Sequence, residues 1–216
     1  MEATLSGQIA LAKKRRNLTI AVSVLIVLGA MALDTKVIVN GSENDIRVQA
    51  FSADNYAEQL YPDVRNFITD NAVELDTLIP ALHENKNDAV ARYGVAGGIA
   101  PVIPIKFSAT VGEGKSGIFK LFSDTIPDDI KVRIQTGPAI NGTVLRDATG
   151  RVQFGEFKNQ MEYQDVGAAL NRVMKAQILD SLDRESLTGK RINVIGAFRL
   201  MSMKSWMVTP VKLDVE

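Results

Sequence analysis

The sequence predicts an α+β protein made of an N-terminal membrane-targeting helix, a small helical subdomain and a β-barrel that carries a packed helix. Three successive patterns predict these parts: an uncharged apolar run, apolar residues at three- and four-residue spacing, and finally alternation of apolar and polar residues. The predicted boundaries are 1–33 for a cytoplasmic tail with the membrane-targeting segment, 34–100 for an extended linker with the helical subdomain, and 101–216 for the barrel.

The composition excludes several classes of chemistry. Lys and Arg (25) balance Asp and Glu (25), which argues against a nucleic-acid partner. The chain has no cysteine and a single histidine, His83, so cysteine nucleophiles, disulfides, cysteine zinc sites and metal motifs that need two histidines are excluded. We therefore predict no cofactor, no bound metal and no enzymatic activity.

The membrane-targeting segment comprises residues 18–33, which contain no charge and directly follow a basic cluster at residues 13–16. As a helix it measures about 24 Å, slightly less than the roughly 30 Å hydrocarbon core of a bilayer. The basic cluster is expected to stay in the cytoplasm. This predicts an anchor in a bacterial inner membrane with the bulk of the chain in the periplasm.

A second interpretation of the same segment stays open. Ala30-Met31-Ala32 has the small-x-small pattern of a signal-peptidase site. Cleavage after Ala32 would release a soluble periplasmic domain, whereas an uncleaved segment would tether it. Without cysteine there is no residue for a lipid anchor.

The first part of the exported region is predicted to be extended and then helical. Residues 36–39 form a short strand or linker before an Asn40-Gly41 turn. Asp54 is the expected N-cap of a first helix that Pro62 kinks or divides. A second helix carries an apolar stripe, and a third runs over 87–93 and ends at Gly94. The stripe of the second helix comprises Leu75, Leu78, Ile79 and Leu82.

The barrel region begins with strands at 105–111, 118–122 and 130–134, and apolar and polar residues alternate in the first and third of them. A tight connection at 112–117 joins the first two. Asp165 is the expected N-cap of a longer helix, whose opposite faces are apolar and polar. The apolar stripe comprises Val166, Ala169, Leu170, Val173, Met174 and Ile178, and the polar face Asn171, Arg172 and Lys175.

Two strands close the chain, at 190–200 and 206–215. Ile192, Val194 and Phe198 are expected to point inward around Gly196, where a small barrel needs a sharp bend or a close backbone approach. In the last strand Val211, Leu213 and Val215 alternate with Lys212 and Asp214. This succession of strands with an inserted helix predicts a barrel of the oligonucleotide/oligosaccharide-binding (OB) type.

Four local motifs favour structural interpretations. Residues 112–116 resemble the end of a P-loop, but Ala109 stands where its first glycine is needed, so a hairpin turn is favoured. Two acidic clusters, Asp124/Asp128/Asp129 and Asp180/Asp183/Glu185, are read as solvated turns, although the first leaves a hydrolase as an alternative. His83 suits a helix C-terminus. Five aromatic residues form either a stacking platform on the barrel or core: Phe107, Phe119, Phe122, Tyr163 and Trp206.

The densest polar stretches, 137–147 and 154–163, carry the candidate binding site. One interpretation is a ligand or partner site; the favoured one is a buried polar network that joins the helix entry to the sheet. In either case Arg146 and Asp147 are expected to form an ion pair. The candidate residues are Asn141, Thr143, Arg146, Asp147, Asn159, Gln160 and Tyr163.

These stretches also carry a resemblance. The segments GPAINGTVLRDA and FGEFKNQMEYQDVGAALN, with LTGKRINVIGAF and VTPVKLDV downstream, resemble the bacterial predicted periplasmic lipoprotein family named domain of unknown function 2291, over roughly residues 34–216. The resemblance implies a helical subdomain with an OB-like barrel, no established activity, and frequent association with sugar transport systems of the ATP-binding-cassette (ABC) type. The sequence departs from the family in having LGAMALDTKV where the lipobox cysteine is expected.

Together these observations predict a membrane-tethered, non-enzymatic periplasmic accessory protein. Its expected partners are the membrane, through residues 18–33, and the subunits or solute-binding protein of an ABC-type sugar transporter. The alternative is the cleaved, soluble periplasmic ligand-binding domain.

Overall fold

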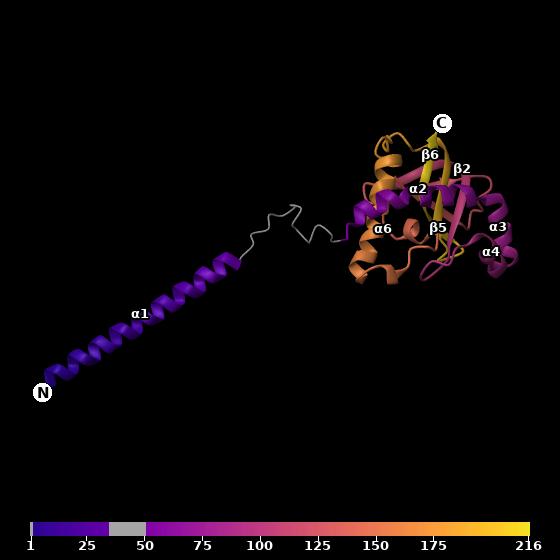
Figure 1. Cartoon of the computed structure of the whole chain (residues 1–216). Helices are drawn as coiled ribbons and strands as arrows, with labels where there is room; N and C mark the ends of the chain where they lie inside the picture. Colours follow the sequence, from indigo (N-terminus) through magenta and orange to yellow (C-terminus); the bar gives the residue numbers. More distant parts are fainter. Residues whose placement is uncertain (1, 35–50) are drawn as a thin grey trace. The chain divides into compact units, whose positions relative to one another are not determined.

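The computed structural model describes the backbone of residues 2–34 and 51–216, and the side chains of 17–34 and 51–216. The chain divides into two units, Met1–Ala50 and Phe51–Glu216 (Figure 1). The predicted strand at 36–39 and the Asn40-Gly41 turn lie outside the described residues.

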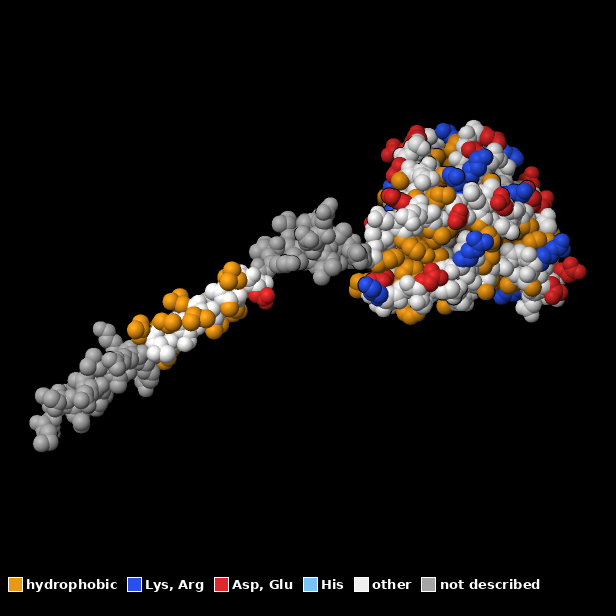
Figure 2. Space-filling view, viewed as in Figure 1, with side chains coloured by type: hydrophobic (Ala, Val, Ile, Leu, Met, Phe, Trp, Pro, Cys, Tyr) orange, Lys and Arg blue, Asp and Glu red, His pale blue; other side chains and the backbone are white. Residues whose placement is uncertain are grey.

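Helix α1 spans Glu2–Asp34 without interruption. Within it, Asn17–Asp34 has a mean hydropathy of 2.0 and is not buried against any other part of the described chain. Apolar side chains are visible along this segment in Figure 2. Eighteen helical residues extend over about 27 Å, so length and composition suit a membrane span. The predicted apolar helix is confirmed.

Helix α2 (Ala53–Asn71) opens the second unit and differs from the prediction at two positions. Its N-cap is Ser52, whose Oγ accepts a hydrogen bond from the Asn55 N–H at 3.3 Å, so the expected cap at Asp54 is wrong. The helix also continues through Pro62. A fully buried face of the helix offsets the hydrogen bond that proline cannot donate. This face consists of Ala57, Tyr61, Val64 and Ile68.

The next two helices match the expected pattern. A two-residue strand, β1 (Val73–Glu74), precedes α3 (Leu75–Glu84) and α4 (Lys86–Tyr93), and α4 has Gly94 as its C-cap. All four residues of the predicted apolar stripe in α3 are buried.

Five longer strands form the barrel: β2 (Val102–Lys115), β3 (Ile118–Phe122), β4 (Lys131–Gln135), β5 (Arg191–Arg199) and β6 (Ser205–Val215). Their order is β2-β3-β4-β6-β5, and β5 pairs again with β2, which closes the ring. Only β4 and β6 are parallel among these neighbours. Closure is uneven, because β2 and β5 pair over their whole shared length whereas β3 and β4 pair briefly.

The connection between β2 and β3 is tighter than expected. The strand continues through Gly112 to Lys115, with a register shift between Val111 and Gly114. Ser116 and Gly117 alone make the turn, with φ of 54° and 74°, as in the two-residue hairpins that follow the twist of the strands. The hairpin interpretation of the P-loop-like stretch is confirmed.

Gly196 lies where the backbones of β5 and β6 come closest. A Cβ at this position would lie 2.5 Å from the Thr209 carbonyl oxygen. The pairing register also shifts between Ile195 and Gly196. The predicted close approach is confirmed. At the far end of β6, Val215 is exposed, because it is the last residue of the strand.

Between β4 and β5 the chain forms α5 (Val144–Asp147), a 3₁₀ turn (Phe154–Glu156), α6 (Gln160–Met174) and a π-helical turn (Lys175–Leu179). Asn159 is the N-cap of α6 and accepts a hydrogen bond from the Glu162 N–H at 2.9 Å, so the predicted cap at Asp165 is wrong. Asn171, expected on the polar face, is buried and donates to the Gly142 carbonyl at 2.9 Å.

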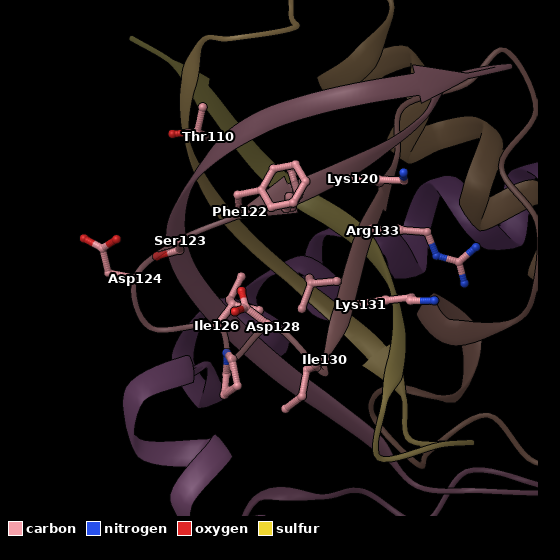
Figure 3. Close-up of a pocket in the computed structure, with 13 residues that line it drawn as sticks. Thr110, Lys120, Phe122, Ser123, Asp124, Ile126, Asp128, Ile130, Lys131 and Arg133 are labelled. Atoms are coloured by element: carbon pink, nitrogen blue, oxygen red, sulfur yellow. The ribbon is translucent and has the colours of Figure 1, made fainter.

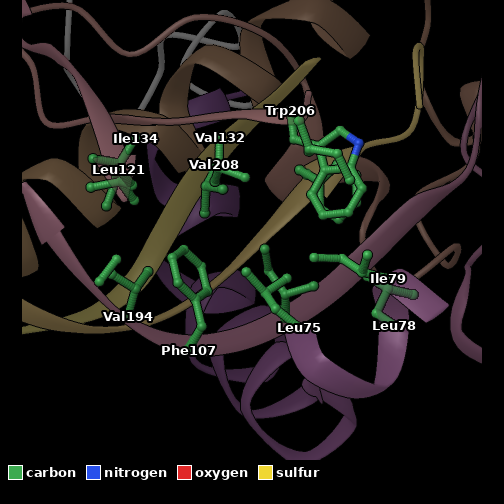
Figure 4. Close-up of a cluster of buried hydrophobic side chains, with 14 of the residues drawn as sticks. Leu75, Leu78, Ile79, Phe107, Leu121, Val132, Ile134, Val194, Trp206 and Val208 are labelled. Atoms are coloured by element: carbon green, nitrogen blue, oxygen red, sulfur yellow. The ribbon is translucent and has the colours of Figure 1, made fainter. Parts of the chain in front are cut away.

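Two hydrophobic clusters hold this unit together. The first fills the barrel interior and includes the buried residues of α3 and α4; Leu75 and Ile79 lie on the same side of this cluster as Trp206 in Figure 4. The second joins α2, α5 and α6 to the outer side of the barrel at Val102, Ala197 and Val211. The helices of the expected helical subdomain therefore share the hydrophobic clusters of the barrel.

Candidate functional site

The predicted polar site contains a buried ionic network around Asp147. Arg146 donates from Nε to Asp147 Oδ1 at 2.7 Å and from Nη2 to Oδ2 at 3.2 Å. Thr143 Oγ1 donates to Oδ2 at 2.8 Å, and Arg199 of β5 also donates to this oxygen. The predicted Arg146–Asp147 ion pair is present, and Arg199 extends it to the barrel.

Tyr163 of α6 completes this network. Its ring lies over the Arg146 guanidinium, 3.6 Å from carbon to centroid, and its carbonyl accepts from Arg146 Nη1 at 3.1 Å. Burial raises the pKa of the Asp147 carboxyl. Hydrogen bonds from Arg146, Thr143 and Arg199, together with the positive charge of Arg146, lower it by more, so the net pKa lies below 3.8. The carboxylate therefore stays ionised and joins α5, α6 and β5. This geometry suits a structural role.

The other candidate residues lie apart from the network. Asn141 is exposed and exchanges hydrogen bonds between its backbone and the Gln135 side chain at 2.9 and 3.1 Å. Asn159 caps α6, and Gln160 is exposed in the first turn of that helix. The structure thus brings together Thr143, Arg146, Asp147 and Tyr163, but not Asn141, Asn159 and Gln160.

The five aromatic residues do not form one platform. Phe107, Phe119 and Trp206 are buried in the barrel interior, and Tyr163 belongs to the Asp147 network. Phe122 differs, because 58% of it is exposed.

The acidic clusters are divided among other contacts. Asp129 lies 3.7 Å from Lys204 Nζ, while Asp180 pairs with Lys175. Asp183 accepts from the Glu185 N–H at 3.2 Å, as expected in a turn. Among the residues that the structure describes, no group of three or more His, Asp or Glu side chains is arranged to hold a metal ion.

A groove lies on the outer side of β3 and β4 and under the loop of residues 123–130. Its volume is about 530 Å³, within the range of small-molecule sites. Strand alternation directs Leu121 and Val132 into the barrel core. The side chains on either side of each of them in the sequence therefore lie on the groove side. These groove-side residues are Lys120, Phe122, Lys131 and Arg133 (Figure 3).

Three cations lie close together in this groove. Lys120 is directly opposite Arg133 in the pairing of β3 with β4, and Lys131 lies two residues from Arg133. None of the three forms an ion pair with another described residue. Arg133 donates from Nη2 to Ser205 Oγ at 3.1 Å, whereas its Nε is buried without a hydrogen-bond partner in the described part of the chain. Opposed like charges destabilise a sheet, and an anion in the groove would offset that repulsion.

Two carboxylates, Asp124 and Asp128, also line the groove from the loop. In Figure 3 the amino and guanidinium groups lie on the strand side, and Asp124 lies on the opposite side. The groove therefore has a cationic wall on the strands, and a loop that contributes both carboxylates and apolar side chains, Ile126 and Ile130.

The order of the strands is that of an OB barrel, in which the second and third strands offer a ligand-binding face. A model of the DUF2291 family, described as a predicted periplasmic lipoprotein, matches residues 21–214. The chain belongs to the DUF2291 family. No curated protein matches its sequence.

A crystal structure described as an OB-fold protein, from Thermotoga maritima, is similar to this DUF2291 member with a TM-score of 0.63. The two chains are 16% identical, and the match covers 78% of this chain and all of the other. This similarity identifies the fold: a mixed α+β unit with an OB-type barrel. In the barrel of this chain β3 and β4 are the second and third strands. The groove therefore lies on the face formed by these two strands.

Sequence patterns did not identify the groove. Lys131 and Arg133 were read as the polar side of a half-buried strand and Phe122 as a stacking or core aromatic, and only the pairing of β3 with β4 places them beside Lys120. The alternation at 130–134 did signal the outward direction of Lys131 and Arg133. The loop that encloses the groove contains the first acidic cluster singled out from the sequence, and two of its three members, Asp124 and Asp128, line the groove.

Proposed function

We propose that this DUF2291 member is a membrane-tethered periplasmic accessory protein that works beside an ABC-type sugar transport system. The observation that carries the proposal is the basic cluster at 13–16 directly before the uncharged helical span Asn17–Asp34. Such a cluster stays in the cytoplasm, which assigns the Phe51–Glu216 unit to the periplasm. The family description, a predicted periplasmic lipoprotein, supports the same compartment.

The anchor is proposed to replace a lipid. The 216 residues contain no cysteine, so an acylated cysteine of the kind the family description implies has no counterpart in this sequence. The apolar part of α1, which precedes the barrel unit in the sequence, provides a peptide alternative.

The accessory role rests on binding. An OB-type barrel with a groove of about 530 Å³ supports recognition of a ligand or partner. The transporter is proposed because the resemblance described above implies an association with sugar transport systems. Its subunits and its solute-binding protein are the proposed partners.

Intact mass spectrometry of the native protein extracted from membranes tests the tether, and crosslinking in the same preparation tests the partners. The expected result is a mass that retains residues 18–33, together with crosslinks from the barrel unit to transporter subunits. A full-length mass with no transporter crosslinks would reject the accessory role and keep the tether.

The second candidate is a soluble periplasmic ligand-binding domain, favoured by the Ala30-Met31-Ala32 sequence. A mass that begins at Leu33, with the protein in the soluble periplasmic fraction, would support this candidate and reject the tether.

A further inference from the structure

We infer that the groove on β3 and β4 binds a small ligand that carries one phosphate or carboxylate group on a sugar ring. The inference rests on the proposed function, because it names the ligand class of that binding surface. Its starting point is the cationic wall of Lys120, Lys131 and Arg133, for which the described residues provide no ion-pair partner.

The wall has the chemistry of an anion site. A guanidinium binds phosphate or carboxylate through two parallel hydrogen bonds, and ammonium groups add charge without fixed geometry. Arg133 is held by Ser205 through Nη2, while its Nε has no partner among the described residues. An anionic group between Arg133 and the two lysines would reduce the repulsion among the three cations.

The remainder of the groove suits a ring with hydroxyl groups. Phe122 has 58% of its surface exposed beside the cations, and an aromatic face packs well against the C–H face of a sugar. Asp124 and Asp128 on the loop can accept hydrogen bonds from hydroxyl groups. A volume of about 530 Å³ accommodates a ligand of this size.

A polyanion fits this surface poorly. The two loop carboxylates would repel additional phosphates, and the whole chain has no net positive charge. Nucleic-acid binding draws on neutralisation of many phosphates by a basic surface, which this groove lacks. A single anionic group on a small ligand is therefore favoured over an oligonucleotide.

Titration calorimetry on the full chain in a zwitterionic detergent tests the inference. The probes are glucose 6-phosphate, glucuronate, glucose, inorganic phosphate, a soluble short-chain phosphatidic acid and a short oligothymidylate. At least one of the two anionic sugars is expected to bind ten-fold or more tightly than glucose and than inorganic phosphate. Equal binding of glucose, or no binding of either anionic sugar at millimolar concentration, would overturn the inference.

Two probes distinguish other sources of the same anionic chemistry. Tighter binding of the phosphatidic acid than of both sugars would assign the groove to a lipid headgroup and reject a sugar ligand. Tighter binding of the oligothymidylate than of both sugars would assign the groove to nucleic acid and would also reject a sugar ligand.

Variants locate the binding. The double variant Lys120→Gln with Lys131→Gln is expected to weaken binding of the anionic sugar ten-fold or more, and Lys86→Gln, an exposed lysine on α4, is the matched control. Phe122→Ala is expected to weaken it several-fold, with Phe154→Ala, 51% exposed and outside the groove, as its control. Unchanged affinity in the double variant would reject the groove as the site.

A stability measurement accompanies these titrations. Removal of opposed like charges should leave the melting temperature of the double variant unchanged or slightly higher, so lost binding would not reflect unfolding. Crosslinks to a transporter without binding of either anionic sugar would reject this inference and keep the proposed function. The reverse result would keep the ligand and reject the transporter.

Discussion

Burial and ion pairing act in opposite directions on Asp147. Only 6% of the residue is exposed, which disfavours its charge, yet Arg146 and Arg199 both contact the carboxylate. Removing one member of a buried ion pair leaves the remaining charges uncompensated. The energetic importance of this residue therefore lies in the two arginines that depend on it.

We predict that Asp147→Asn lowers the free energy of unfolding by about 3 kcal/mol. For a protein of this size the melting temperature should fall by roughly 6–12 °C, measured by circular dichroism. Asp54→Asn removes an exposed ion pair with Arg172 and is expected to cost under about 1 kcal/mol. Equal effects of the two substitutions would contradict a structural role for the network.

The same carboxylate predicts a pH dependence. Its folded pKa is depressed below 3.8, so its stabilising effect is complete above the unfolded pKa and is lost as pH falls through the folded pKa. Wild type should lose more stability than Asp147→Asn as the pH is lowered below about 4. Parallel acid-unfolding curves would show that Asp147 is not the titrating group responsible.

Tyr61 provides an independent prediction at alkaline pH. Its hydroxyl is buried without a hydrogen-bond partner among the described residues, and burial raises its pKa to about 12, against a smaller lowering by Arg65. Folding therefore favours the protonated phenol, and stability falls as pH rises from about 10 through 12.

Tyr61→Phe should remove the unsatisfied hydroxyl and increase the free energy of unfolding by about 1 kcal/mol at pH 7. The variant should also lose less stability than wild type above pH 10. Thermal melting at pH 7 and chemical unfolding at pH 10 to 11 measure the two effects. A large destabilisation at pH 7 would indicate that the hydroxyl has a partner in solution.

At the scale of elements, helix α6 shows how a cap differs from a ligand-binding residue. Asn159 accepts from the Glu162 N–H, and the Lys158 N–H donates to the Glu162 carboxylate at 3.0 Å. Asn159→Ala is expected to cost about 1 kcal/mol, or roughly 2–4 °C in melting temperature. Gln160→Ala, one residue further and exposed, is the control and should change it little.

If Asn159→Ala melts like wild type but weakens binding of a ligand or partner, the binding interpretation of this residue is favoured over the capping one. The same pair of variants therefore decides between the two interpretations that the sequence left open for the residues near 159–163.

Most elements could be predicted from the sequence because their apolar spacing matches their burial. The alternation at 105–111 and the stripe of α3 are examples. The start of α6 could not be located, since its first turn is exposed and the apolar pattern begins only at Val166. Arg199 was missed as part of the Asp147 network because the two residues lie 52 positions apart.

At the scale of the whole molecule, the candidate site depends on topology. The closing pair β2–β5 and the parallel pair β4–β6 join strands that are distant in sequence. Local patterns indicated which way each side chain points, but not which strands are neighbours. The groove could not be predicted because it forms where the loop of residues 123–130 folds against β3 and β4, and no local pattern indicates the path of that loop. The OB-type barrel could be predicted from the number of strands and the inserted helix.

The membrane orientation makes a prediction about whole cells. Protease added to intact spheroplasts should degrade the Phe51–Glu216 unit, detected with antibodies against it, while a cytoplasmic marker stays intact. Reversing the charge of the four basic residues at 13–16 should increase the protected fraction, because the orientation signal is removed. Full protection of the wild-type unit would contradict a periplasmic location.

The coverage of the barrel is unequal around its circumference. Helices α2 and α6 pack on the outer side of β2, β5 and β6, so substitutions there disturb the fold. The four outward positions of β3 and β4 that line the groove, Lys120, Phe122, Lys131 and Arg133, are members of neither hydrophobic cluster. Selection can therefore alter the ligand preference of these four positions with little loss of stability, and relatives of this chain are expected to diverge there first.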